Sequence, residues 1–133
     1  MWSATSFNQL SRDGLDVERW NRLHPEESPR KSHVEECLAN RHGPVIAATD
    51  YMQNYAGQIR QFVPALYVTL GTDGFGRSDR RSNLRNHFEV DRYYITVAAL
   101  KSLADEGDIP FTKVSEAIEK FGINTEKTNP AIA

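Results

Sequence analysis

The stretch PVIAATDYMQNYAGQIRQFVPALYVTL, residues 44–70, decides the fold class. It begins with an apolar, β-branched run at 44–49 and ends with a second apolar run at 65–70. Such continuous runs are typical of parallel strands that are buried on both faces. The segment between them has helical periodicity, and Pro64 ends the helix. Strand, helix and strand in this order predict a βαβ unit with a right-handed connection.

The helix inside this unit is expected to begin at Asp50, a residue type common at the N-cap. Gln53, three residues later, completes a capping-box pattern. Apolar residues then fall on one helical face, namely Met52, Tyr55, Ile59 and Val63. The pattern predicts an amphipathic helix that connects the two strands.

The chain before this unit is expected to hold a strand and two helices. Residues 2–7 alternate in size and predict a strand, whereas residues 8–23 read as a helix weakened by Gly14. Its apolar residues are partly in register: Leu10, Val17, Trp20 and Leu23. A polar loop follows at 24–33, and a short helix covers 33–40.

The chain after the unit is mostly helical. One short helix starts at about Asp79, and Asp91 can cap a longer one that Gly107 ends. Residues 93–100 also have strong β propensity, so a strand is the alternative there.

The last predicted helix spans 112–121, with Thr112 as its cap and a Schellman ending at Gly122 and Ile123. Residues 124–133 form a tail. Together these segments predict a single α/β domain over residues 1–133 with at most three parallel strands, which is few for an open sheet.

Composition sets the class of protein. The 133 residues are 39% hydrophobic and 26% charged, which fits a globular domain, and a net charge of −2 gives no reason to expect nucleic acid or membrane as a partner. The single cysteine, Cys37, excludes an internal disulfide and fits a reducing compartment. No signal peptide or membrane span is visible, so we expect a cytoplasmic protein.

The segment TLGTDGFGRSDRRSNLR, residues 69–85, is rich in glycine and arginine and follows a strand. Its glycine spacing is neither GxGxxG nor a P-loop, so positive φ values at a sharp turn explain it more simply than phosphate binding. The alternative is a small-anion-binding module that uses residues 71–78 at a helix N-terminus.

The arginines of this segment have two readings. Arg77, Arg80, Arg81 and Arg85 could form a solvated helix face. Several lie near a helix N-terminus, however, where the macrodipole disfavours cations. An equally weighted interpretation is therefore that they bind carboxylates in another domain or subunit.

Metal and nucleophile sites are poorly supported. His33 and Cys37 stand four residues apart with His42 nearby, but a closed zinc site needs four ligands. Cys37 is more simply a small buried residue, and His24 and His87 have no visible partner. No catalytic or metal-binding residue is predicted in this chain.

A family resemblance rests on LGTDGFGRSDRRSNLRNHFEVDRYYITVAAL and TDYMQNYAGQIRQFVP, together with the Asn-Pro near the end. These segments resemble the C-terminal part of the homodimeric bacterial pyruvate dehydrogenase first component, a family that depends on thiamine diphosphate and Mg²⁺. The resemblance runs from Trp2 to the last residue. It implies a transketolase C-terminal-like, three-layer αβα fold with a mostly parallel sheet, from which the first strand and helix are missing here.

The family decarboxylates pyruvate and acetylates the lipoyl group of the second, acetyltransferase component. The resemblance implies that the cofactor lies between other domains, so this chain should bind none and should be inactive alone. It also implies, as partners, the rest of the parent chain, the second subunit of the homodimer and the second component. The candidate interface residues are Gly71, Asp73, Phe75, Arg77, Ser78, Arg80, Arg81, Arg85 and His87. A related transketolase-type enzyme is the alternative parent.

Overall fold

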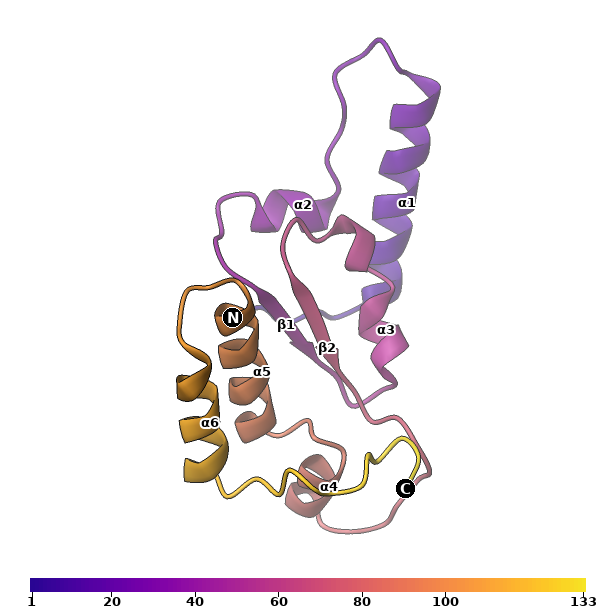
Figure 1. The fold of residues 1–133 in the computed structure, drawn as a ribbon. Coiled ribbons are helices and arrows are strands. Elements are labelled where there is room, and N and C mark those ends of the chain that lie inside the picture. Colours follow the sequence, from indigo (N-terminus) through magenta and orange to yellow (C-terminus); the bar gives the residue numbers. More distant parts are fainter.

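The computed structural model describes all of residues 1–133, and Figure 1 shows its elements in space. In chain order these are α1 (Phe7–Leu23), α2 (His33–Leu38), β1 (Val45–Ala48), α3 (Gln53–Gly57), the 3₁₀ turn η1 (Arg60–Phe62), β2 (Tyr67–Leu70), α4 (Arg81–His87), α5 (Arg92–Asp105) and α6 (Phe111–Lys120). No helix has both the length and the apolarity needed to cross a membrane. The fold is mixed α/β.

The sheet has two strands, β1 and β2, which pair in parallel with Val45 opposite Tyr67 and Ala48 opposite Leu70. This confirms the strand–helix–strand unit predicted from residues 44–70. The predicted strand at 2–7 is wrong, because the chain there is irregular and exposed until Ser6 caps α1. The Ser6 hydroxyl accepts a hydrogen bond from the Gln9 N–H at 3.2 Å.

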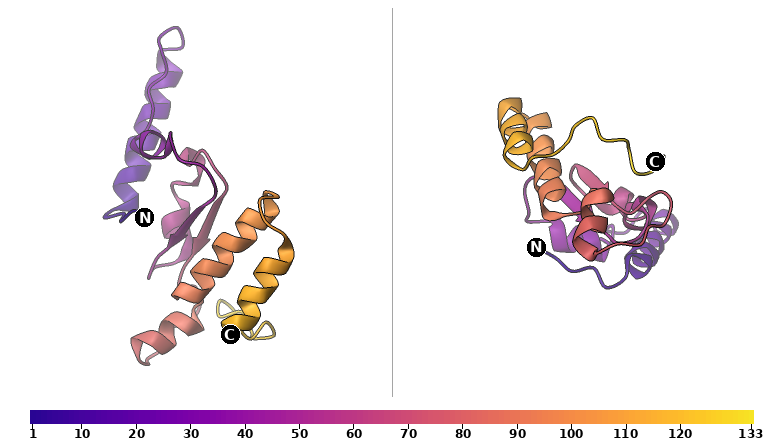
Figure 2. Two further views of the ribbon diagram at one scale, coloured as in Figure 1. Left: turned by 90° about the vertical axis from the view of Figure 1, so that its left-hand side faces the viewer. Right: turned by 90° about the horizontal axis from the view of Figure 1, so that it is seen from below.

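Helices flank both faces of the sheet, as the left view of Figure 2 shows. On one face, Val34, Ile59, Phe62 and Tyr67 form the buried cluster, with residues of α1 and β1 packed against it. On the other face α5 lies against the strands, and α6 packs on α5. The residues of β1 and β2 other than Tyr67 are only half-buried or exposed, so the prediction of strands buried on both faces is wrong for this chain.

Gly14 is needed for packing. A Cβ atom there would lie 2.5 Å from the Phe62 ring, and Phe62 is 4% exposed. The missing side chain therefore lets η1 approach the middle of α1. The helix predicted over 8–23 is confirmed, but Leu23 at its end is exposed rather than packed in the core.

The connecting helix is shorter than predicted. It ends at Gly57, and η1 follows before Val63. Its N-cap is Met52, which makes no side-chain capping bond, so the Asp50–Gln53 capping box is wrong.

The two ends of α5 match the sequence pattern. The Asp91 carboxylate accepts hydrogen bonds from the N–H groups of Tyr93 and Tyr94, and Gly107 ends the helix with a φ of 83°. Residues 93–100 are thus helical, and the strand alternative is wrong.

For α6, Pro110 rather than Thr112 is the N-cap. Its predicted Schellman ending is confirmed: Gly122 has a φ of 65°, and the Ile123 N–H bonds the Ile118 carbonyl.

Two segments extend from the body at opposite ends of the molecule (Figure 1). The second half of α1 and the loop after it project beyond the amino ends of the strands. Residues 124–133 cross the opposite end, beside α4 and the loop that follows β2. This second end, at the carboxyl ends of both strands, holds the candidate residues.

Candidate interface at the glycine and arginine loop

The loops that follow β1 and β2 are joined by hydrogen bonds. The Thr72 N–H donates to the Tyr51 carbonyl at 2.8 Å, and the Thr72 hydroxyl donates to the Asp50 carbonyl at 2.7 Å. Because β1 and β2 are parallel, their carboxyl ends bring these two loops to the same edge. The glycine-containing loop is therefore held in place by its neighbour.

Gly71 and Asp73 also take part in this contact between the two loops, which we call the joint. A Cβ at Gly71 would lie 2.5 Å from the Gln53 nitrogen and 2.7 Å from the Tyr51 oxygen, so only glycine fits between these loops. The Asp73 carboxylate accepts a hydrogen bond from the Gln53 N–H at 3.0 Å. Asp73, 20 residues after Gln53, thus supplies the capping bond that was predicted for Asp50.

The other two glycines of the loop differ from each other. Gly74 has a φ of 115°, and a Cβ there would collide with the Pro130 carbonyl in the C-terminal segment. Gly76 has no positive φ, and a Cβ there would meet nothing within 4 Å. The structural explanation by positive φ therefore applies to Gly74, close approach explains Gly71, and nothing in the structure explains Gly76.

Two N–H groups where the loops meet are not free to bind an anion. The Thr72 and Gln53 N–H groups are bound to protein oxygens, as described above. At the start of α4, the Asp79 carboxylate accepts bonds from the Arg80 N–H at 2.6 Å and from the Asn83 amide at 3.1 Å. An anion here would meet two carboxylates, Asp73 and Asp79.

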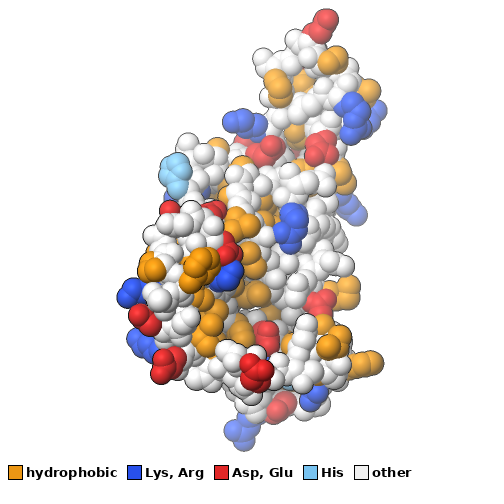
Figure 3. All heavy atoms as spheres, in the orientation of Figure 1, with side chains coloured by type: hydrophobic (Ala, Val, Ile, Leu, Met, Phe, Trp, Pro, Cys, Tyr) orange, Lys and Arg blue, Asp and Glu red, His pale blue; other side chains and the backbone are white.

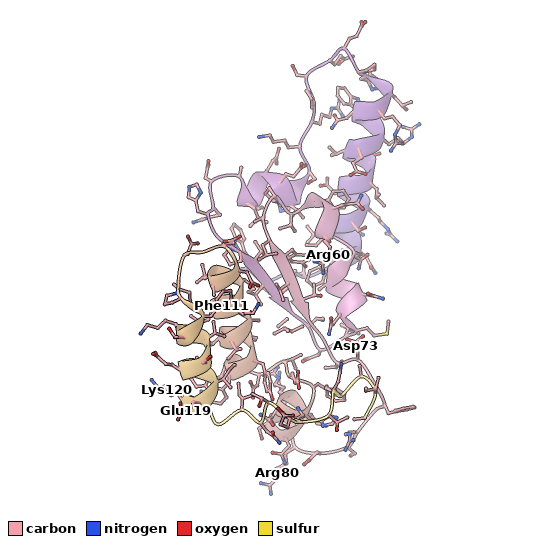
Figure 4. The ribbon with its side chains drawn as sticks, in the orientation of Figure 1. Arg60, Asp73, Arg80, Phe111, Glu119 and Lys120 are labelled. Carbon is pink, nitrogen blue, oxygen red and sulfur yellow. The ribbon has the colours of Figure 1, made fainter.

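The four arginines lie on one loop and helix but differ in their partners. Arg85 is 3.9 Å from the Asp50 carboxylate, and both side chains are substantially exposed. Arg77, Arg80 and Arg81 are exposed and form no ion pair within the chain. In Figure 4, the labelled Arg80 side chain points away from the body of the molecule.

Phe75 and Ser78 lie in the exposed part of the same loop. The Phe75 side chain is 78% exposed, and Ser78 is also exposed and makes no hydrogen bond. Phe75 stands in the same loop as the arginines, and aromatic and arginine side chains are enriched at the centre of protein–protein interfaces.

His87 lies at the end of α4, where it packs edge-on against Phe88. Burial lowers the pKa of His87 below its ordinary value, and repulsion from Arg77 and Lys127 lowers it further. The shift favours the neutral imidazole over the charged form. This fits a contact residue better than a cation.

Lys127, which no sequence pattern indicates, ties the C-terminal segment to this site. Its ammonium group donates to the carbonyls of Asn86 at 3.0 Å and His87 at 2.7 Å and lies 3.4 Å from the Glu89 carboxylate. These contacts span about 40 positions, so no local pattern could have indicated them. They fix the end of α4, where Glu89 adopts a φ of 62°.

This sequence is similar to those of known proteins. Residues 1–91 match the model of the transketolase-like TK C-terminal domain. The chain belongs to this family. Within the transketolase-like domain, α1 to α4 and both strands lie in the matched part, as does the whole of the glycine and arginine loop.

The relatives of this transketolase-like domain include several proteins named pyruvate dehydrogenase E1 component. The one from Pseudomonas aeruginosa is 64% identical over 131 residues, which cover 98% of this chain and 15% of that protein. The one from Cupriavidus necator is 59% identical over 98% of this chain and 14% of its own length. The one from Escherichia coli K12 is 52% identical over all of this chain and 15% of its own length. The chain thus spans about one seventh of the relatives it matches.

Other candidate residues of the transketolase-like domain lie elsewhere. His33 and Cys37 are brought together on α2, with 3.4 Å between Nε2 and Sγ, but no group of three metal-ligating side chains occurs in the chain. Cys37 is half-buried. His24 stacks on Trp20, so it is a packing residue at the end of α1.

An open hollow of about 740 Å³ lies beside the loop, between the carboxyl end of β1 and the starts of α4 and α5. Its lining combines apolar residues such as Ile95 with the charged side chains of Asp50, Arg85 and Arg92. The transketolase-like domain therefore presents both a recess and unpaired arginines at one end.

Proposed function

We propose that this chain works as the C-terminal domain of a pyruvate dehydrogenase first component. Such an enzyme decarboxylates pyruvate on thiamine diphosphate and acetylates the lipoyl group of the second component. The proposal is carried by 52–64% identity, over nearly the whole chain, to proteins that bear this name. Because those proteins are about seven times longer, their activity belongs to the assembled enzyme.

Within that enzyme the domain braces the subunits and performs no chemistry. Its surface supports this role. A compact monomer of 15.1 kDa exposes about 7,100 Å², whereas this chain exposes 9440 Å². Only 13 of 133 residues are buried, and the sheet has two strands. We propose that further strands of a three-layer, mostly parallel sheet lie outside these residues and cover part of this surface.

Thiamine diphosphate and Mg²⁺ are held by the other domains in this proposal. The glycine loop supports this division, because the Thr72 and Gln53 N–H groups are used within the protein and the Asp73 and Asp79 carboxylates would repel a diphosphate. The chemistry that the cofactor supplies is decarboxylation. This chain provides no ligand to the cofactor and helps to hold the other domains in position.

Arg77, Arg80 and Arg81 are the contact residues, together with Arg85. Three of them lack an acidic partner in the chain, and Arg80 and Arg81 stand at the N-terminal end of α4, where the helix dipole opposes positive charge. A guanidinium group binds carboxylates in a fixed two-bond geometry. We propose that acidic side chains of the second subunit bind them.

The test is the double variant Arg77→Ala/Arg81→Ala in the full-length enzyme, with Lys120→Ala on α6 as the matched control. Removing both guanidinium groups should weaken the dimer at least tenfold in analytical ultracentrifugation and lower the activity at low enzyme concentration. The control should behave as the wild type. Unchanged dimer affinity and activity in the double variant would refute the proposed role of the arginines.

A further inference from the structure

The outer face of α1 carries a second cationic surface, separate from the arginine loop. Six exposed residues follow one another at helical spacing on this face. We call them the α1 stripe: Arg12, Leu15, Asp16, Arg19, Arg22 and Leu23. Figure 3 shows basic and hydrophobic side chains gathered along the projecting end of α1, with acidic ones at its tip.

The apolar members of the stripe are unusually exposed for their size. Leu15 is 52% exposed and Leu23 is 55% exposed. The periodicity of the sequence predicts that Leu23 packs inward, but the loop after α1 covers Trp20 instead. The two leucines therefore have no cover within this chain.

The loop after α1 is held to the helix by side-chain contacts. Trp20 stacks on His24 with 4.3 Å between ring centroids, and the Arg30 guanidinium lies 3.7 Å from the Trp20 centroid. The Asn21 amide bonds both the N–H and the carbonyl of Arg30, at 2.8 and 3.0 Å. These contacts fold the loop back along the inner side of α1. A partner of the outer side would thus pay little ordering entropy.

Charge identifies the partner. The stripe contains three arginines and one aspartate, and none of the four side chains forms an ion pair or hydrogen bond in the chain. Leucines between the arginines favour a protein over a nucleic acid, because a phosphate backbone offers them no apolar contact.

We infer that the α1 stripe is a second docking surface, which binds an acidic protein segment with apolar side chains. The inference rests on the proposed function, since it places that segment in the remainder of the full-length protein. The domain then holds two acidic surfaces at once, one at each end of the molecule. The large exposed area of the chain fits such a connecting role.

The test places the photo-cross-linker p-benzoylphenylalanine at Leu23, and separately at Leu15, in the full-length protein. Mass spectrometry then identifies the cross-linked peptide. We expect a peptide from outside these 133 residues with more Asp and Glu than Lys and Arg. The charge reversal Arg19→Glu/Arg22→Glu should lower the yield roughly fivefold, because it replaces attraction by repulsion. Lys120→Glu, on the distant α6, should leave the yield unchanged.

This cross-linking result can be distinguished from the dimer-affinity test of the arginine loop, because a cross-link can be detected in both the monomer and the dimer. A cross-link at neither position, a cross-linked peptide without excess acid, or a nucleic acid or lipid adduct would overturn the inference. So would a charge reversal that leaves the yield intact. Equal melting temperatures of the reversed and control variants establish that a lost cross-link is not lost folding.

Discussion

Replacing Gly71 by alanine tests the joint between the two loops. The added Cβ would lie 2.5 Å from the Gln53 nitrogen, which is 0.9 Å inside the 3.4 Å at which ordinary contact begins. The atoms in the way are backbone, so they cannot rotate aside. Overpacking of this kind costs about 1–3 kcal/mol. Loss of the Thr72 and Asp73 hydrogen bonds adds about 1 kcal/mol each. We expect a total of about 3–5 kcal/mol, or a fall in Tm of about 11–18 °C.

The assay is urea unfolding of the purified protein, with Gly76→Ala as the matched control. Gly76 stands in the same loop, but its Cβ would meet nothing within 4 Å. The control should change the free energy of unfolding by less than about 0.5 kcal/mol, or raise it slightly by restricting the unfolded chain. A Gly71→Ala protein as stable as the wild type, or a control as unstable as Gly71→Ala, would show that contact with the Gln53 backbone does not require glycine at position 71.

Three further predictions concern the core and the site. Gly14→Ala should lower stability by about 1–3 kcal/mol through its clash with Phe62, and Phe62→Leu in the same chain should recover part of the loss in a double-mutant cycle. Burial raises the pKa of Tyr67 from 10.0 to about 12, so the unfolded chain loses this proton first and stability should fall as the pH rises from 10 to 12. Urea unfolding of Tyr67→Phe over this range should show a smaller fall, and an equal fall would contradict the burial. The pKa of His87 is lowered by burial and then by Arg77, so its contribution to stability is present above its ordinary pKa of 6.5 and is lost as the pH falls below it. An NMR titration of Arg77→Ala should show the His87 pKa raised. An unchanged pKa would mean that Arg77 does not act on the His87 imidazole.

Local patterns were sufficient for most of the secondary structure. The β-branched runs gave both strands of the parallel pair, and Asp91, Gly107 and Gly122 marked helix ends correctly because capping involves neighbours in the chain. Residues 2–7 failed as a strand because strand formation needs a pairing partner, and the structure provides none.

The sequence named candidate residues by type and could not give their geometry. The sequence singled out Asp73 and the arginines, yet the capping bond from Asp73 to Gln53 depends on how β1 and β2 are aligned. The contacts of Lys127 with the end of α4 likewise join segments 40 and 41 residues apart. Such roles follow from tertiary structure, so neither spacing nor propensity could have indicated them.

We propose that the loop GTDGFGRSD, residues 71–79, is a structural and interface element rather than a cofactor site. Isothermal titration calorimetry of this 133-residue chain with thiamine diphosphate and Mg²⁺ tests it most directly. We predict no heat of binding at millimolar cofactor, because the N–H groups of the joint are occupied and its carboxylates oppose a diphosphate. Saturable binding in the micromolar range, abolished by Arg77→Ala/Arg81→Ala, would contradict the account and make the loop the cofactor site.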